Sequence, residues 1–250
     1  MYKRQGHKGL VWTASFLPDN KGLVSAGSDS SIIYWDIETK NPNTVYKGKS
    51  RIKHIEVSPD GNFIAVGNEK GQVMLLDRKN NYAESVIVDH KGKAVHALAF
   101  SKDGKFVVSG DENGTIRVYN LEQEKIVAAL VDHRARINDI EFSNDNTQMA
   151  TTSFDGTVRL WDFNNLNEEP LIFRDHDMWV WSVGFSQDGN KLFAGCVDNL
   201  IRVWPTSTDF MSDRICGKVN RNLTGKEWYR YVATDIPYEL TCPSLPSSEA

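Results

Sequence analysis

The sequence has 250 residues, of which 40% are hydrophobic and 25% are charged, and its formal net charge is −4. This is an ordinary globular composition, and its mild acidity disfavours nucleic acid and anionic lipid surfaces as partners. No apolar run approaches the roughly 18 residues of a membrane-spanning helix, so the sequence predicts no contact with a membrane interior.

A unit of similar spacing recurs along the first 205 residues. His90, His133 and His176 follow one another at intervals of 43 residues. Each unit ends in an aromatic residue 28 or 29 positions after its histidine, and the pairs are His7 with Trp35, His90 with Tyr119, His133 with Trp161, and His176 with Trp204. A further unit from Gly48 to Asp77 keeps the turn at 58–61 but lacks both markers, so we interpret it as a degenerate copy.

Strand signals lie between these markers. Ile137–Phe142 and Thr157–Trp161 alternate apolar and polar residues with a period of two, and short turns rich in Asp, Gly and Asn separate such segments. A period of this length with four strands per unit is typical of propeller blades. Over residues 1–205 the sequence resembles the WD-repeat β-propeller family.

The resemblance implies an all-β fold, a β-propeller of five WD-repeat units with four-stranded antiparallel blades and a short helical C-terminal tail. The blades are expected at 7–47, 48–89, 90–132, 133–175 and 176–205, and a strand at 2–6 could complete the last blade. The tail is expected at 206–250. Because the family more often forms larger rings, we favour an incomplete propeller over a closed ring of five. Such an arc would expose blade faces and sheet edges, and we then expect self-association.

In the family, a buried hydrogen-bond chain joins the Trp, a Ser or Thr, the His and a turn Asp of each blade. The resemblance places complete tetrads at His7, Ser25, Asp29 and Trp35, and at His133, Thr151, Asp155 and Trp161. The third unit keeps Ser109 but has Asn113 and Tyr119, and the fifth has Ala194 in place of the hydroxyl. The second unit has none of the four, which brings the rigidity of that blade into question.

The family binds partners on the face formed by the starts of the innermost strands. Carried over position by position, this face contains Leu10, Trp12, Arg51, Lys53, His96, Arg136, Asn138, Phe154, Trp179 and Trp181. Trp and Arg are enriched in binding hot spots, so we interpret the face as a partner site. The alternative is that Trp12, Trp179 and Trp181 only fill the mouth of the channel between blades.

The first functional hypothesis is a scaffold or sensor that binds proteins or peptides on this face. The second is a sensor of nucleic acid or a small ligand, with basic side chains and stacked rings. An enzyme is not expected, because the histidines belong to different blades and no CxxC, HExxH or phosphate-loop spacing occurs. The sequence predicts no metal and no cofactor.

The tail has a different pattern. Met211, Ile215 and Val219 predict a helix of about eleven residues after Thr208, and Thr224 with Glu227 forms a capping box that opens a second helix. The run from Arg221 through Cys242 resembles the ending of large bacterial WD-repeat signalling proteins. This resemblance implies the C-terminal part of such a protein.

The N-terminal residues and the cysteines indicate the cellular compartment. Residues 1–7 have no apolar segment behind their positive charges, so no signal peptide is predicted. Cys196, Cys216 and Cys242 are too few and too scattered for a disulfide framework. Together these features favour a reducing cytoplasm.

Overall fold

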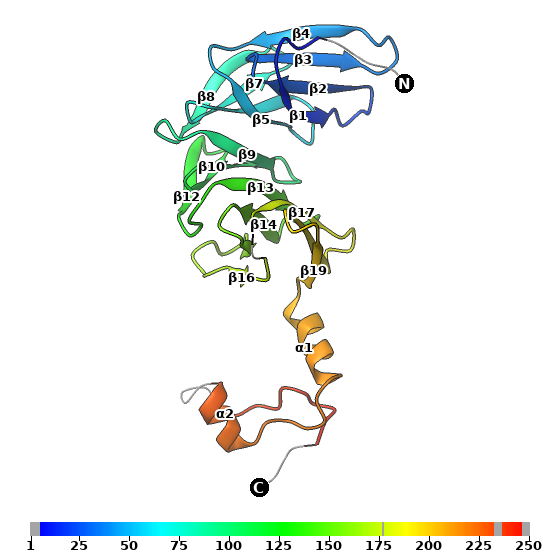
Figure 1. The fold of residues 1–250 in the computed structure, drawn as a ribbon, viewed down its shortest axis with the longest axis vertical. Helices are drawn as coiled ribbons and strands as arrows, with labels where there is room; N and C mark the ends of the chain where they lie inside the picture. The colour runs from blue at the N-terminus through cyan, green and yellow to red at the C-terminus, as the bar shows by residue number, and fades with distance from the viewer. Residues whose placement is uncertain (1–5, 177, 233–236, 247–250) are drawn as a thin grey trace.

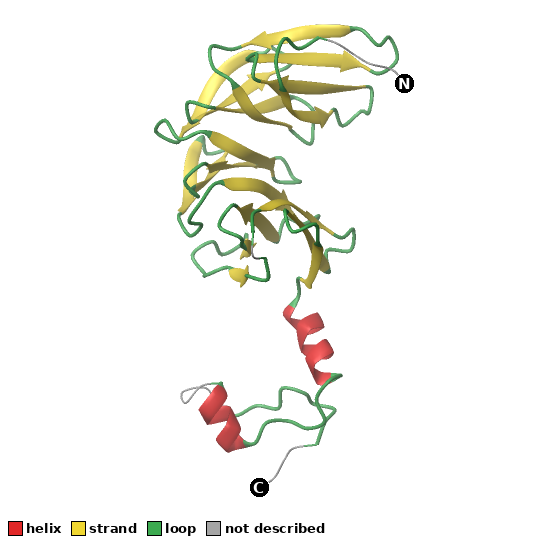
Figure 2. Ribbon diagram, in the orientation of Figure 1, coloured by secondary structure: helices red, strands yellow, loops and turns green. Residues whose placement is uncertain are grey.

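A computed structural model describes residues 6–176, 178–232 and 237–246 of the chain (Figure 1). Within these residues five antiparallel sheets follow one another along an arc, and both helices lie in the tail that leaves its last sheet (Figure 2). Each sheet is one blade, and its strands are hydrogen-bonded in chain order. The all-β propeller architecture that the repeats predict is therefore confirmed.

The first four blades each have four strands. The first blade contains β1 (Val11–Phe16), β2 (Gly22–Gly27), β3 (Ser31–Asp36) and β4 (Pro42–Lys47). The second contains β5 (Ile52–Val57), β6 (Phe63–Asn68), β7 (Gln72–Asp77) and β8 (Ala83–Asp89). The third contains β9 (Val95–Phe100), β10 (Phe106–Asp111), β11 (Ile116–Asn120) and β12 (Lys125–Leu130). The fourth contains β13 (Ile137–Phe142), β14 (Gln148–Ser153), β15 (Val158–Asp162) and β16 (Leu171–Phe173).

The fifth blade has three strands in the described residues: β17 (Val180–Phe185), β18 (Lys191–Cys196) and β19 (Ile201–Pro205). The strand that we predicted at 2–6 to complete this blade falls mostly outside the described residues, and Gly6 is not part of a strand. A four-stranded fifth blade therefore stays a prediction.

A recurring turn joins the first two strands of most blades. Ser58 donates its hydroxyl to Asp60, and the same bond joins Ser101 to Asp103 at 2.6 Å. Gly61 and Gly104 follow with φ near +70°, a conformation that glycine adopts without steric cost. The short Asp-Gly turns of the sequence therefore fix where each innermost strand ends.

Blades pack face to face through their inner strands, and the two ends of the arc lack this cover. Phe142 of the fourth blade is 1% exposed against the third blade, but Phe16, at the matching position of the first blade, is 63% exposed. At the other end, Val203 is 49% exposed, whereas the matching Val118 is completely buried. The described residues therefore form an open arc, in which β1 and β19 belong to blades at opposite ends (Figure 1).

The two complete tetrads form as predicted. His7 contacts Asp29 through Nδ1 at 3.0 Å and Ser25 through Nε2 at 2.7 Å, and the Trp35 indole donates to the Ser25 hydroxyl at 2.7 Å. In the fourth blade, His133 contacts Asp155 and Thr151, each at 2.9 Å, and the Trp161 indole donates to Thr151 at 3.0 Å. These chains tie the second and third strands to the segment that enters each blade.

The third blade has its acidic residue at another position. His90 contacts Ser109 through Nε2 at 2.8 Å and Asp111 through Nδ1 at 2.9 Å, whereas Asn113 stands where the family tetrad has its turn Asp. Asp111 is the last residue of β10, two residues before the position that the repeat predicted. Its second oxygen accepts from the backbone of Asn113 and Thr115, so one carboxylate closes the turn and binds the histidine.

The second blade closes its turn without a histidine. Asn68, at the position equivalent to Asp111, accepts backbone N–H bonds from Lys70 and Gln72 through its side-chain oxygen. Apolar residues stand at tetrad positions instead, since Val66 replaces the hydroxyl and Leu76 the terminal aromatic, and both are buried in a core shared with the first blade. The blade nevertheless has all four strands paired.

The tail begins with α1 (Thr208–Cys216), which is shorter than the predicted helix and leaves Val219 beyond its end. The helix α2 (Gly225–Tyr231) has the predicted capping box, in which Thr224 accepts from the Glu227 backbone and Glu227 accepts from the Thr224 backbone. The capping box is therefore confirmed.

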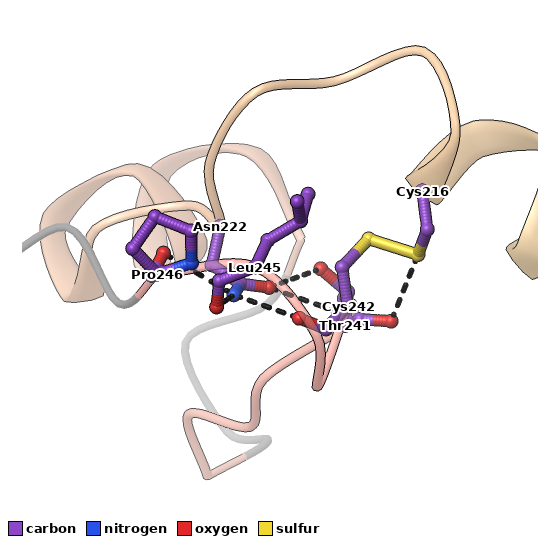
Figure 3. Close-up of a disulfide and its surroundings, with 6 residues drawn as sticks. All are labelled: Cys216, Asn222, Thr241, Cys242, Leu245 and Pro246. Atoms are coloured by element: carbon purple, nitrogen blue, oxygen red, sulfur yellow. Dashed lines mark hydrogen bonds between the residues drawn. A yellow bond between two sulfur atoms is a disulfide. The ribbon is translucent and has the colours of Figure 1, made fainter.

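A disulfide between Cys216 and Cys242 joins the end of α1 to the last described segment, a bond that we did not expect from three cysteines judged too few and too scattered for a disulfide framework (Figure 3). The bond was missed because the two residues are 26 positions apart in an irregular segment. Buried Asn222 supports the same junction by accepting from the Cys242 backbone at 2.9 Å and donating to its carbonyl at 3.0 Å.

Candidate functional site: the mouth of the central channel

Every blade has one extra residue in its innermost strand. The pairing with the second strand skips one position in each case, and the skipped residues are Trp12, Lys53, His96, Asn138 and Trp181. A β-bulge of this kind leaves the extra residue out of the ladder and redirects its side chain. The five bulges therefore present five side chains at the same level of the arc.

These side chains meet at one cavity of about 560 Å³. Its lining consists of the five bulged residues and three neighbours, and the full set is Trp12, Lys53, His54, His96, Arg136, Asn138, Asp139 and Trp181. Because each blade contributes through its innermost strand, the cavity lies at one end of the channel that the strands surround. We call it the channel mouth.

The structure separates the sequence-predicted face into three groups. Trp12, Lys53, His96, Arg136, Asn138 and Trp181 line the channel mouth. Phe154 and Trp179 lie beside it, since the Phe154 ring contacts Trp181. Leu10 and Arg51 lie outside the lining; Leu10 is highly exposed, and Arg51 pairs with Glu69 at 3.9 Å. That any of these residues contacts a partner stays a prediction.

An aromatic group forms one side of the mouth. The rings of Phe154 and Trp179 are stacked with centroids 4.5 Å apart, and Trp181 meets Phe154 edge to face at 5.1 Å. The Arg136 guanidinium lies over the Phe154 ring, 3.9 Å from its centroid. It also donates through Nε to Asn138 at 2.8 Å, and Asn138 donates to the Val180 carbonyl at 2.6 Å. These contacts fix the Arg136 charge against the fourth and fifth blades.

On the other side of the mouth, a second cation lies over an aromatic ring. Lys53 Nζ lies 4.0 Å from the centroid of the Trp12 ring, so a side chain of the second blade covers one from the first. A cation over an aromatic face is attracted by the ring quadrupole but keeps its charge. The mouth therefore has two fixed positive charges, each beside exposed aromatic surface.

Neutral histidines and acids lie in the same cavity and on the strands beside it. Burial lowers the pKa of His54 to about 4, and burial together with the charges of Arg136 and Lys53 lowers the pKa of His96 to about 4. Burial raises the pKa of Glu56 to about 7 and that of Asp139 to about 6. The two histidines are therefore neutral at pH 7, and Glu56 is only partly ionised.

The prediction of the face missed His54 and Asp139, which also line the cavity. Each directly follows a bulged residue, and strict alternation would place only one residue of such a pair in the channel. His54 accepts the Leu98 backbone N–H at 3.1 Å, and Asp139 accepts that of Val183 at 3.0 Å, so both bridge neighbouring blades. The sequence has no signal for a bulge at these positions.

One further cluster contains donor atoms suited to a metal. In the fifth blade, ligand atoms of His176, Cys196 and Asp198 lie within 4.8 Å of one another. Arg202, however, donates to His176 Nδ1 at 2.8 Å and also to the Asp198 carboxylate, so a guanidinium already contacts two of the three groups. We therefore assign these residues to the structure of the blade. In the described part of the chain, no helix is long and apolar enough to cross a membrane.

Comparisons with known proteins agree with this architecture. The family model described as IFT122 first beta-propeller matches residues 1–205. The small ribosomal subunit protein RACK1y of Oryza sativa subsp. japonica is 28% identical over 81% of this chain and 50% of its own length. Eukaryotic translation initiation factor 3 subunit I of Aspergillus terreus is 30% identical over 64% of this chain and 52% of its own. An uncharacterised WD repeat-containing protein of Synechocystis is 29% identical over 73% of this chain and 41% of its own.

The chain thus spans about half the length of the curated relatives that it matches. The family match covers all five blades described above and ends where the tail begins. This chain therefore belongs to the IFT122 first beta-propeller family, a family of WD-repeat β-propellers.

Proposed function

We propose that this chain is an interaction module that binds a protein or peptide segment at the channel mouth. The observation that carries the proposal is that each of the five blades directs one bulged side chain into the same cavity. Bulges weaken a sheet locally, and they are typical of positions where a side chain is re-aimed for binding. Five bulges at one level indicate a shared surface rather than five local irregularities.

The chemistry of the mouth supports a protein partner. Trp12, Trp179 and Trp181 are 38%, 46% and 47% exposed, so each ring has surface left to bury. Trp and Arg are the residues most enriched in binding hot spots. Relatives of this chain also have names that describe parts of assemblies, such as the guanine nucleotide-binding protein subunit beta of Zea mays.

The alternative, a nucleic-acid sensor, is less well supported by the same rings. Base stacking needs open aromatic faces. One face of Phe154 is covered by Trp179 and Arg136 also lies over this ring, while Lys53 lies over Trp12. Binding of an unstructured oligonucleotide with a steep salt dependence would favour this alternative.

We further propose, from the resemblance of the tail alone, that the module works in bacterial signalling. The matching relative from Synechocystis is compatible with a bacterial setting. A cytoplasmic location also stays a prediction, because the Cys216–Cys242 bond weakens its argument from cysteines too few and too scattered for a disulfide framework. The proposal assigns no catalytic step to the channel mouth, only binding.

The test is capture of partners by the whole chain and by two variants, Trp179→Ala and Trp181→Ala, with identification by mass spectrometry. Both variants should lose the specific partners and keep the melting temperature close to that of the parent. Tyr231→Ala, an exposed aromatic of the tail, is the matched control and should keep the partners. Loss of folding in both Trp variants would show that the rings are core, and unchanged capture would refute the site.

A further inference from the structure

We infer that the partner segment presents an acidic side chain, Asp or Glu, which enters the channel mouth between Lys53 and Arg136. The inference rests on the proposed function and specifies the chemistry of its partner. It begins with the two cations, which reach the same cavity from the second and fourth blades. The third blade lies between them and contributes His96.

Neither of these two cations has a carboxylate partner among the described residues. In the described residues, Arg51 pairs with Glu69, Lys102 with Glu141 and Arg159 with Asp132, but no ion pair involves Lys53 or Arg136. Their contacts are instead aromatic faces and, for Arg136, the neutral Asn138. A cation held in place without neutralisation keeps its attraction for an incoming anion.

Both charges act within the cavity, as their effect on His96 shows. Arg136 and Lys53 each add to the burial that lowers the pKa of this imidazole, so it is neutral at pH 7 and so is His54. The carboxylate within the lining, Asp139, already accepts backbone N–H bonds from Val183 and Ile140. The polar groups of the lining are therefore two cations, two neutral imidazoles, one amide and the Asp139 carboxylate, which is already hydrogen-bonded.

The size and composition of the mouth fit a side chain on a peptide rather than a phosphate backbone. A cavity of about 560 Å³ admits one or two side chains, and Trp12 and Trp181 offer apolar surface for the methylene groups of Asp or Glu. A polyanion would instead need a basic track across the surface, and the chain as a whole has a net charge of −4. The geometry therefore favours a single carboxylate that both cations contact.

The experiment selects binders from a random dodecapeptide display library with the full chain immobilised, and then measures each recovered peptide on variants. Lys53→Met and Arg136→Met replace each cation by an unbranched side chain without charge. Lys79→Met is the matched control, since Lys79 lies on an exposed turn of the second blade, outside the cavity and outside the predicted face. Arg136→Lys restores the charge, and the melting temperature of every variant is measured in parallel.

We expect recovered peptides to share an Asp or Glu, and we expect binding to weaken at least about tenfold in Lys53→Met and in Arg136→Met. Lys79→Met should bind within about twofold of the parent, and Arg136→Lys should bind more tightly than Arg136→Met. Raising the salt from about 50 mM to about 500 mM should weaken binding further.

Three results distinguish a failure of the acidic-partner inference from a failure of the proposed function. Peptides without acidic residues, lost in Trp181→Ala but unaffected by Lys53→Met and Arg136→Met, would refute the acidic partner and leave the interaction module intact. A thymidine oligonucleotide that displaced the peptides would overturn the choice of a peptide carboxylate. If no peptide responded to Trp181→Ala, the proposed function itself would be refuted.

Discussion

His176 of the fifth blade has no hydrogen-bond partner for its buried Nε2 atom among the described residues, because Ala194 stands where other blades have a hydroxyl. Ser25, Ser109 and Thr151 occupy the matching position, and each contacts a histidine Nε2 at 2.7 to 2.9 Å. Since Nδ1 of His176 accepts from Arg202, we infer that Nε2 bears the proton. A buried donor without an acceptor costs stability.

Ala194→Ser should therefore stabilise the protein. The new hydroxyl can accept from His176 Nε2, and a net gain of about 0.5 to 1.5 kcal/mol is ordinary for such a bond. For a chain of this size the melting temperature should rise by about 2 to 4 °C per kcal/mol. Thermal unfolding measures the change, with Thr151→Ala as the opposite substitution, expected to destabilise. A lower melting temperature for Ala194→Ser would mean that the site has no room for the hydroxyl.

His133→Ala should destabilise the protein more than His96→Ala. His133 is buried and joins Asp155 to Thr151, so its removal leaves an acceptor and a donor unpaired at a cost of about 1 to 3 kcal/mol. His96 lines the open channel mouth, where water can replace it. Denaturant midpoints of the two variants make the comparison, and equal midpoints would contradict the structural role of the tetrad.

Glu56→Gln should change how stability depends on pH. Burial, with Glu141 and Asp139 nearby, raises the pKa of Glu56 from 4.5 to about 7 in the folded chain. Between these values the folded state keeps a proton that the unfolded state has lost. Its contribution to stability is therefore fully present below about pH 4.5 and is lost as the pH rises to about 7.

Glu56→Gln has no titrating carboxyl group at this position. Its melting temperature relative to the parent should therefore increase between pH 5 and pH 8. Melting curves at several pH values measure this difference, and Glu122→Gln on an exposed turn is the control. A difference that stayed constant across this range would show that Glu56 titrates normally.

The ends of the arc should make the protein self-associate. Phe16 and Ile201 are 63% and 75% exposed on faces that are buried between inner blades, and a cavity of about 600 Å³ lies over Trp35. Contiguous apolar surface of this kind favours association. Light scattering should detect oligomers that increase with concentration, and the double variant Phe16→Ser with Ile201→Thr should reduce them. Tyr231→Ser is the matched control, and a parent chain that remained monomeric throughout would contradict the prediction.

The repeat could be recognised from the sequence because its markers are local. Each tetrad uses a histidine, a hydroxyl and an aspartate at fixed spacings, and turns such as that after Ser58 fix the strand ends. The third blade shows where this reasoning fails. Asp111 reaches His90 from the end of the strand, two residues before the turn position, and spacing alone favoured Asn113.

The other features that were not predicted from the sequence depend on contacts that no local pattern determines. The Cys216–Cys242 bond depends on how an irregular tail returns to the end of α1. His54 and Asp139 enter the channel only because a bulge precedes each of them, and a bulge has no reliable residue signature.

The bulges also separate the side chains of the proposed partner site from those that form the apolar cores. A bulged residue has left the ladder, so its identity is not set by strand pairing. Trp12, Lys53, His96 and Trp181 are therefore positions at which ring and charge can be exchanged one blade at a time, whereas Asn138 also bonds to the fifth blade. If the proposed site is correct, a chain of this design can acquire a new partner through single substitutions while its blades continue to pack as before.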